Sequence, residues 1–148
     1  IERTALMNPI EDEIALRNLM ARYCDAVNRV DADAWIATWS EDAVWNLLGN
    51  PVGGKDNILA LWKQMISSFE FALMMPSSCL FEISGDTASG HWYLHEYTRD
   101  PEGNASTVLS RYNDTYVRQD EQWLFQSRDY SFIYNGPGDM SGDYTPPA

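Results

Sequence analysis

One carboxylate lies within an apolar segment of the chain, where it could take part in chemistry. Residues 88–99 read ASGHWYLHEYTR, and strand alternation places Trp92, Leu94 and Glu96 on one face. A carboxylate buried among apolar neighbours is costly unless it is paired or used in a reaction. Burial would raise the pKa of Glu96, which would allow it to act as a general acid or base.

Other polar side chains are predicted to meet this carboxylate if the apolar faces of their elements face one another. They are Tyr23, Ser110, Tyr112 and Arg128. Tyr23 could donate a hydrogen bond to an oxyanion or enolate, and Arg128 could clamp an acidic or carbonyl group. A structural interpretation stays open, in which Glu96 and Arg128 pair with each other and Tyr23 is an ordinary core tyrosine.

The elements that position these residues can be read from the periodicity of the sequence. Alternating segments between 88 and 134 predict an antiparallel meander of three strands, which must bury one face. The predicted helices that could cover it span 9–28, 32–39 and 55–69, and further short strands are expected at 43–48 and 80–84. On the first helix, Glu11, Asp12, Arg17 and Arg22 are expected mostly on the outer side. In the last strand, the alternation groups Leu124, Gln126, Arg128, Tyr130 and Phe132 on one face.

Helices that precede strands in this way indicate an α+β fold in a single domain, residues 1–148. Residues 49–54 are rich in glycine and are expected to form a loop. Residues 135–148 show no period, and we expect a loop tail that lies over a pocket mouth or lacks fixed structure.

Composition excludes several classes of function. The chain has 148 residues and a net charge of −12, which argues against nucleic acids and against anionic membrane surfaces as partners. No apolar run is long enough to span a membrane. Two cysteines, Cys24 and Cys79, do not form a disulfide framework, so we expect a cytoplasmic protein with reduced thiols. No phosphate-binding loop and no metal-ligand motif is found, and His91 and His95 lack a third ligand. We therefore expect no cofactor and no metal.

Three segments resemble the SnoaL-like proteins of the NTF2-like superfamily. They read RNLMARYCDAVNRVDADAWIATWSEDAVW, ISGDTASGHWYLHEY and SRYNDTYVRQDEQWLFQSRDY. The resemblance implies a cone, in which a strongly curved antiparallel sheet wraps around three N-terminal helices and encloses an apolar pocket. Members of this superfamily include polyketide cyclases, scytalone dehydratase, a bile-acid dehydratase, a hexachlorocyclohexane dehydrochlorinase and ketosteroid isomerase, and some members are not enzymes.

The resemblance also implies roles for single residues. It places a catalytic tyrosine on Tyr23 and an acidic residue on Glu96, and it places the pocket arginine of the dehydrochlorinase on Arg128. The family's catalytic histidine has no counterpart, because the corresponding segment 73–76 reads LMMP. The aspartate that orients this histidine falls on Asn28.

These observations give one leading hypothesis, a cofactor-independent lyase or isomerase that acts on an apolar cyclic or aromatic molecule. Glu96 would move the proton, while Tyr23 and Asn28 would hold an oxyanion with help from Arg128. The substrate would contact Trp45, Leu47, Met74, Trp92, Ser110, Tyr112 and Tyr130. Two alternatives stay open, a non-catalytic ligand-binding or assembly module and the β-subunit of an aromatic-ring dioxygenase. A homodimer or a higher homo-oligomer is expected, with the outer row Tyr93, His95 and Tyr97 in its interface.

Overall fold

Three helices and a six-stranded sheet make up the part of the chain that the computed structural model describes, residues 8–139, 141–143 and 145–147. The helices are α1 (Pro9–Arg29), α2 (Ala32–Ile36) and α3 (Lys55–Ile66). The strands are β1 (Trp39–Leu47), β2 (Asn50–Gly53), β3 (Phe71–Ser84), β4 (Thr87–Arg99), β5 (Ala105–Gln119) and β6 (Gln122–Gly136). The predicted α+β class and the predicted meander are confirmed.

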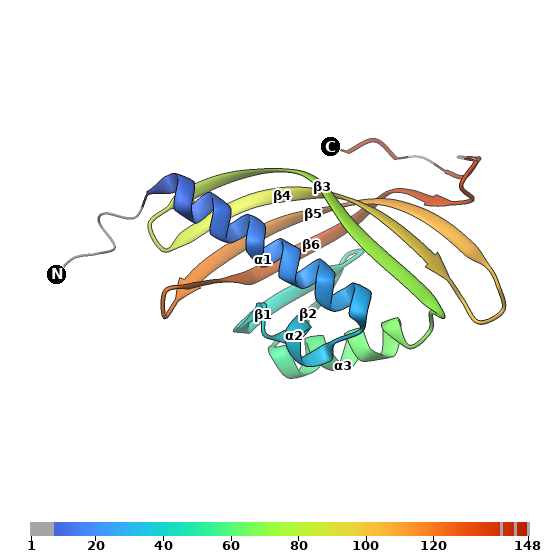
Figure 1. Ribbon diagram of the computed structural model, residues 1–148, viewed down its shortest axis with the longest axis horizontal. Coiled ribbons are helices and arrows are strands. Elements are labelled where there is room, and N and C mark those ends of the chain that lie inside the picture. Colours follow the sequence, from blue (N-terminus) through green and yellow to red (C-terminus); the bar gives the residue numbers. More distant parts are fainter. Residues whose placement is uncertain (1–7, 140, 144, 148) are drawn as a thin grey trace.

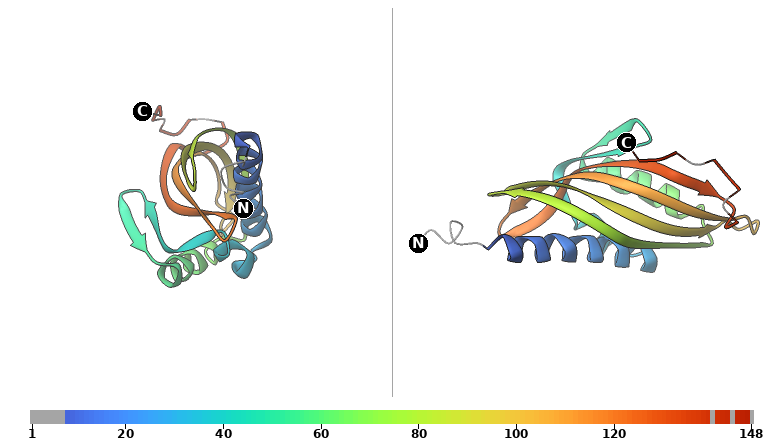
Figure 2. Two further views of the ribbon diagram at one scale, coloured as in Figure 1. Left: turned by 90° about the vertical axis from the view of Figure 1, so that its left-hand side faces the viewer. Right: turned by 90° about the horizontal axis from the view of Figure 1, so that it is seen from above.

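The sheet is mixed, with the strand order β2-β1-β6-β5-β4-β3. Neighbouring strands are antiparallel except β1 and β6, which pair in parallel. The sheet curls around α1, which runs along its inner face, and α3 lies below β1 and β2 (Figures 1 and 2). The helices and the inner face share one hydrophobic core, and this arrangement sets the space in which a ligand could bind.

Helix α1 begins and ends at residues that suit the termini of a helix. The Asn8 side chain accepts a hydrogen bond from the backbone N–H of Ile10 at 2.9 Å, and Pro9 occupies the first turn. Val30 adopts a left-handed conformation with φ 53° and closes the last turn. The predicted apolar stripe of this helix runs from Ile10 to Val27, and its part from Leu16 onward is buried, so Tyr23 faces the sheet; Ile10 and Ile14 are exposed, contrary to the prediction.

Several boundaries differ from the prediction. Helix α2 ends at Ile36 and α3 ends at Ile66, each three residues earlier than expected, and residues 50–53 form a strand rather than a loop. Strand β3 begins at Phe71 rather than near residue 80. Pro76 does not end it, because the pairing with β4 shifts register between Pro76 and Cys79 and accommodates the missing N–H group.

The phase of β6 also differs from the prediction. A register shift between Thr115 and Tyr116 of β5 places Ser127 and Phe125 of β6 opposite these residues, which leaves Gln126 unpaired. A bulge of this kind changes which side chains face inward. Trp123 and Phe125 are therefore buried with Arg128 and Tyr130, whereas Leu124 and Gln126 are not.

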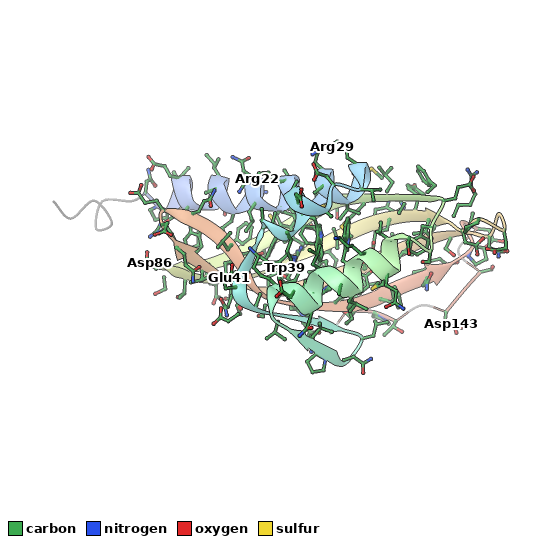
Figure 3. The ribbon with its side chains drawn as sticks, turned by 90° about the horizontal axis from the view of Figure 1, so that it is seen from below. Arg22, Arg29, Trp39, Glu41, Asp86 and Asp143 are labelled. Carbon is green, nitrogen blue, oxygen red and sulfur yellow. The ribbon has the colours of Figure 1, made fainter. Side chains whose placement is uncertain are left out.

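One end of the inner face is closed by a charged cluster that the sequence did not predict. Asp12 was expected on the outer side of α1, but its side chain is buried and its Oδ1 accepts from Arg118 at 2.7 Å and from Trp123 at 3.1 Å. Arg118 also pairs with Asp86 at 2.9 Å. The cause is that the first turn of α1 lies against the turns at this end of the sheet. We call Asp12, Asp86, Arg118 and Trp123 the closed end, and Figure 3 labels Asp86 there.

The described part of the tail folds back along β6. Asn135 lines the inner cavity, so the adjacent Tyr134 points to the outer face of the sheet. Its hydroxyl group donates to the carbonyl of Pro137 and accepts from the N–H of Gly142 at 3.0 Å. These tail residues therefore lie against the outer side of β6, and not over a pocket mouth. Figure 3 shows Asp143 at the end of the molecule opposite Asp86.

Two negative findings apply to the described residues. None of the helices in this part of the chain is both long enough and apolar enough to cross a membrane. No disulfide bond joins Cys24 and Cys79, which are both free.

Candidate active site

A cavity of about 570 Å³ lies between α1, α3 and the inner face of the sheet. Most of its wall is aromatic or aliphatic, which is typical of sites for small organic molecules. The lining residues are Tyr23, Val27, Trp45, Leu47, Leu48, Asn50, Val52, Leu61, Trp62, Met65, Ile66, Phe69, Ala72, Met74, Glu96, Thr98, Ser106, Val108, Tyr112, Tyr130, Phe132 and Asn135. Glu96 is the one charged residue among them.

Glu96 is held in this wall by two hydroxyl groups. It lies on the inner face of β4, between its cross-strand partners Met74 and Val108. Its Oε2 accepts hydrogen bonds from Ser110 Oγ at 2.7 Å and from the Tyr130 hydroxyl group. Within the described chain, no hydrogen bond to Oε1 and no ion pair to this carboxylate is found. Oε1 is thus the oxygen left for a ligand.

The pKa of Glu96 is raised by its surroundings. Burial disfavours the charged form and is the main cause, while the hydrogen bonds from Tyr130 and Ser110 oppose it in part. A carboxyl group with a raised pKa can both accept and return a proton near neutral pH.

The wall also contains a chain of hydrogen bonds that links β1, β5 and α1. Trp45 Nε1 of β1 donates to the hydroxyl oxygen of Tyr112 in β5 at 3.1 Å. The Tyr112 hydroxyl group lies 3.1 Å from that of Tyr23 in α1. Burial raises the pKa of Tyr23 to about 12, so its hydroxyl group stays protonated and can donate.

Arg128 lies beneath this chain and does not line the cavity. Its Nε and Nη2 donate to Asp114 at 2.8 Å and 3.0 Å, and Tyr116 donates to the same carboxylate at 2.7 Å. Its guanidinium carbon lies 3.7 Å from the ring centre of Tyr112 and 4.5 Å from that of Tyr23. Burial, the largest single influence, would lower the pKa of Arg128, but the charge and hydrogen bonds of Asp114 together with the neighbouring Tyr23 and Tyr112 outweigh it, and the pKa is raised.

This placement differs from both expectations for Arg128. It neither pairs with Glu96 nor reaches a ligand as a clamp, because its cross-strand partner in the β5–β6 hairpin is Asp114. The sequence contained the signal, since Asp114 shares the inner face of its strand with Tyr112. Counting back from the turn between β5 and β6 alone would have placed Ser127 opposite Asp114, because the bulge at Gln126 shifts the pairing by one residue and brings Arg128 there instead.

Asn28 also lies outside the cavity wall. Its side-chain Nδ2 donates to the carbonyl of Met74 at 3.1 Å, and its Oδ1 accepts from the N–H of Met74 at 2.7 Å. The amide thus pairs with the backbone of β3 and ties the end of α1 to the sheet. This geometry differs from the expected oxyanion role, because the groups that would serve it are used by the protein itself.

The remaining predicted site residues divide into two groups. Tyr23, Trp45, Leu47, Met74, Glu96, Tyr112 and Tyr130 line the cavity. Trp92 and Ser110 do not: Trp92 packs edge-to-face against Phe81 with ring centres 5.9 Å apart, and Ser110 lies behind Glu96. The sequence did not identify the residues of α3 as part of the cavity wall. Its apolar periodicity predicts a buried face, but it does not show whether that face packs against side chains or lines a cavity.

No group of three or more His, Cys, Asp and Glu residues suited to a metal ion occurs in residues 8–139, 141–143 and 145–147.

Comparisons with known proteins give a consistent result. Residues 8–129 match the family model of the SnoaL-like domain. No curated protein sequence matches the chain. Among solved structures, a proposed aromatic ring hydroxylase from Novosphingobium aromaticivorans is 28% identical, with a TM-score of 0.82 over 90% of this chain and 98% of that one.

Two other solved structures share the fold at lower identity. LinA is 21% identical with a TM-score of 0.81, over 94% of this chain and 96% of that one. A proposed scytalone dehydratase from Novosphingobium aromaticivorans is 19% identical with a TM-score of 0.80, over 91% and 90%. At these identities the similarity establishes the fold, and the activity has to be argued from the site.

Proposed function

The chain belongs to the SnoaL-like family of the NTF2-like superfamily, and on this basis we propose that it is a cofactor-independent lyase or isomerase for an apolar cyclic substrate. The observation that carries the proposal is Glu96, a carboxylate in an aromatic cavity with one free oxygen and no cation beside it. A carboxylate in this setting is held by hydroxyl groups without being neutralised, which leaves it basic.

The reaction that fits this site is proton transfer at a carbon next to a carbonyl group. Glu96 Oε1 takes the proton, and the electron pair of the C–H bond moves toward the carbonyl to give an enolate. In an isomerisation the proton then returns at another carbon; in a dehydration the enolate expels a hydroxyl group from the neighbouring β-carbon as that C–O bond breaks, and the hydroxyl group leaves with the proton as water. Either outcome needs a donor for the oxygen that becomes negative.

Tyr23 is the donor that the geometry favours. Trp45 Nε1 is a donor only, so it fixes the Tyr112 oxygen as an acceptor and directs the Tyr112 proton toward Tyr23. The Tyr23 proton is then free to point into the cavity. Arg128 below the rings adds a fixed positive charge that stabilises negative charge at this oxygen.

The experiment that tests this proposal needs no knowledge of the natural substrate. 2-Tetralone is a neutral bicyclic ketone, and catalysed exchange of its acidic C–H hydrogens for deuterium in D2O reports proton abstraction directly. The protein is expected to accelerate this exchange, measured by NMR, and Glu96→Gln is expected to lower the rate by about 100-fold or more. Glu82→Gln, at an exposed position on β3, removes the same charge away from the cavity and should retain the rate. Equal rates for the protein and Glu96→Gln would contradict the proposal, as would tight binding of the ketone without exchange.

A second function is favoured by one comparison. The relative that is 28% identical is a proposed aromatic ring hydroxylase, which agrees with the alternative of an oxygenase subunit. In that case the chain would copurify in fixed ratio with a larger oxygenase subunit from its source cells, and it would show no exchange of tetralone. Isolation as a free protein with exchange activity would exclude it.

A further inference from the structure

The cavity wall carries an unbalanced negative charge. Of its lining residues, Glu96 alone is charged, and no Lys, Arg or His accompanies it. The buried cation Arg128 lies behind the rings of Tyr23 and Tyr112 and is already paired with Asp114. The net charge of the chain, −12, adds to the same sign. An anionic group placed beside Glu96 would therefore find no cation among the lining residues.

The rest of the lining is suited to uncharged molecules. Four apolar side chains of the wall are well exposed to solvent and so mark its opening: Leu48, Met65, Phe69 and Phe132. The polar residues of the lining beyond the tyrosines are Asn50, Thr98, Ser106 and Asn135, which carry no charge. The lining holds no cation that would compensate the lost hydration of an anionic group.

Two of the polar groups in the wall, Glu96 and Tyr23, are complementary in type. Glu96 Oε1 can only accept a hydrogen bond when ionised, and the Tyr23 hydroxyl group is placed to donate one. A carboxamide or a hydroxyl group supplies both a donor and an acceptor. A carboxylate supplies acceptors only, so it would leave Glu96 without a donor and place a second negative charge next to it.

We infer that the cavity selects ligands by charge. It binds an uncharged cyclic molecule whose polar substituent can both donate and accept hydrogen bonds, and it rejects a molecule of the same shape that carries a carboxylate instead. Glu96 is the residue that determines this specificity. The inference rests on the proposed function in using the same cavity, but it concerns binding and not the proton transfer.

Two aromatic probes of nearly equal shape test it. The probes are compared at mildly alkaline pH, which favours the ionised form of Glu96; 2-naphthamide is neutral there and 2-naphthoate is ionised. Isothermal titration calorimetry is expected to show that the protein binds the amide at least about tenfold more tightly than the carboxylate. In Glu96→Gln the difference should shrink to about threefold or less, mainly because the carboxylate binds more tightly. Glu82→Gln makes the same change in net charge outside the cavity and should keep the full difference.

The outcomes separate this inference from the proposed function. Equal affinities for both probes, a difference that persists in Glu96→Gln, or no binding of naphthamide would each overturn the charge selection. Deuterium exchange that is unchanged in Glu96→Gln would overturn the proton transfer and leave the binding result standing. Loss of exchange in Glu96→Gln, together with equal affinities of the unaltered protein for the two probes, would support the proton transfer and overturn the charge selection.

Discussion

Two carboxylates lie on the inner face of the sheet, on neighbouring strands, and they differ in what holds them. Asp114 in β5 accepts two hydrogen bonds from Arg128 and one from Tyr116, and it is sealed from solvent. Glu96 in β4 accepts two hydrogen bonds from hydroxyl groups on one oxygen and faces a cavity with the other. Asp114 is one half of a buried ion pair, whereas Glu96 is a carboxylate without a cation, which we propose as the base.

The same difference, between carboxylates in buried ion pairs and a carboxylate held by hydroxyl groups, is found along the whole inner face. At the closed end, Asp12 and Arg118 form a second buried ion pair at 2.7 Å, backed by Trp123. Around the cavity, the polar groups are hydroxyl, indole and amide groups together with the single carboxylate of Glu96. Breaking a buried ion pair leaves an uncompensated charge, whereas changing a hydroxyl-held carboxylate to an amide does not. The consequence is that stability and chemistry should respond to different substitutions.

The largest expected effect comes from breaking the sealed pair. Asp114→Asn removes the charge that compensates Arg128 at a site without solvent, so we expect the free energy of unfolding to fall by about 3–5 kcal/mol. Glu96→Gln, the matched change at the other carboxylate, should alter it by less than about 1 kcal/mol because no buried cation loses its partner. Urea denaturation of both variants measures this. Equal losses would show that the two carboxylates do not differ as described.

The next effect concerns the donor side of the cavity. Tyr23→Phe keeps the ring above Arg128 but removes the hydroxyl group, and we expect the tetralone exchange rate to fall by about tenfold to a hundredfold. Tyr134→Phe provides a matched control, because this buried tyrosine faces the tail on the outer side of β6. If both variants exchange at the rate of the unaltered protein, Tyr23 is a core residue and not a donor to the substrate.

A smaller effect distinguishes two roles for Asn28: a structural link between α1 and β3, and the oxyanion role first expected for it. Asn28→Ala loses two hydrogen bonds to Met74, and we expect the free energy of unfolding to fall by about 1–3 kcal/mol. The exchange rate of the folded protein should change by less than about threefold, because the lost groups do not line the cavity. A loss of exchange as large as that of Tyr23→Phe, at unchanged stability, would return Asn28 to the reaction.

The smallest effect is the pH dependence of stability. Burial raises the pKa of Glu96 in the folded state above the ordinary value of 4.5, so the folded protein holds this proton more firmly than the unfolded chain. Its contribution to stability is full below the ordinary pKa and is lost as the pH rises through the raised one. Glu96→Gln lacks this loss, so its free energy of unfolding should increase relative to the unaltered protein as the pH rises through this range. A constant difference, as expected for Glu82→Gln, would count against a raised pKa.

The sequence was informative wherever the signal was periodic. Strand alternation on 88–99 placed Glu96 inward, and the apolar stripe of the first helix placed Tyr23 toward the sheet, as the structure has them. The α+β class and the meander follow from the same patterns and are confirmed. These predictions depend on the local spacing of apolar residues, which can be read directly from the sequence.

What the sequence did not reveal depends on register and on long-range pairing. Gln126 is left unpaired by a bulge, and its residue type does not predict that the inward and outward positions of β6 change there. The partner of Arg128 is Asp114 rather than Glu96, and the amide of Asn28 binds the backbone of Met74. In each case several partners fit the chemistry, and the three-dimensional pairing of the strands selects one of them.

The most direct test of the central claim is to titrate Glu96 itself. Carboxyl ¹³C chemical shifts followed by NMR across the acidic to neutral range, with Glu96→Gln to assign the signal, give the pKa of this one group. A pKa above the ordinary 4.5 is the result that a carboxylate held by hydroxyl groups and left without a cation predicts. A pKa at or below 4.5 would show that Glu96 is stabilised as an ion and would contradict its role as the base.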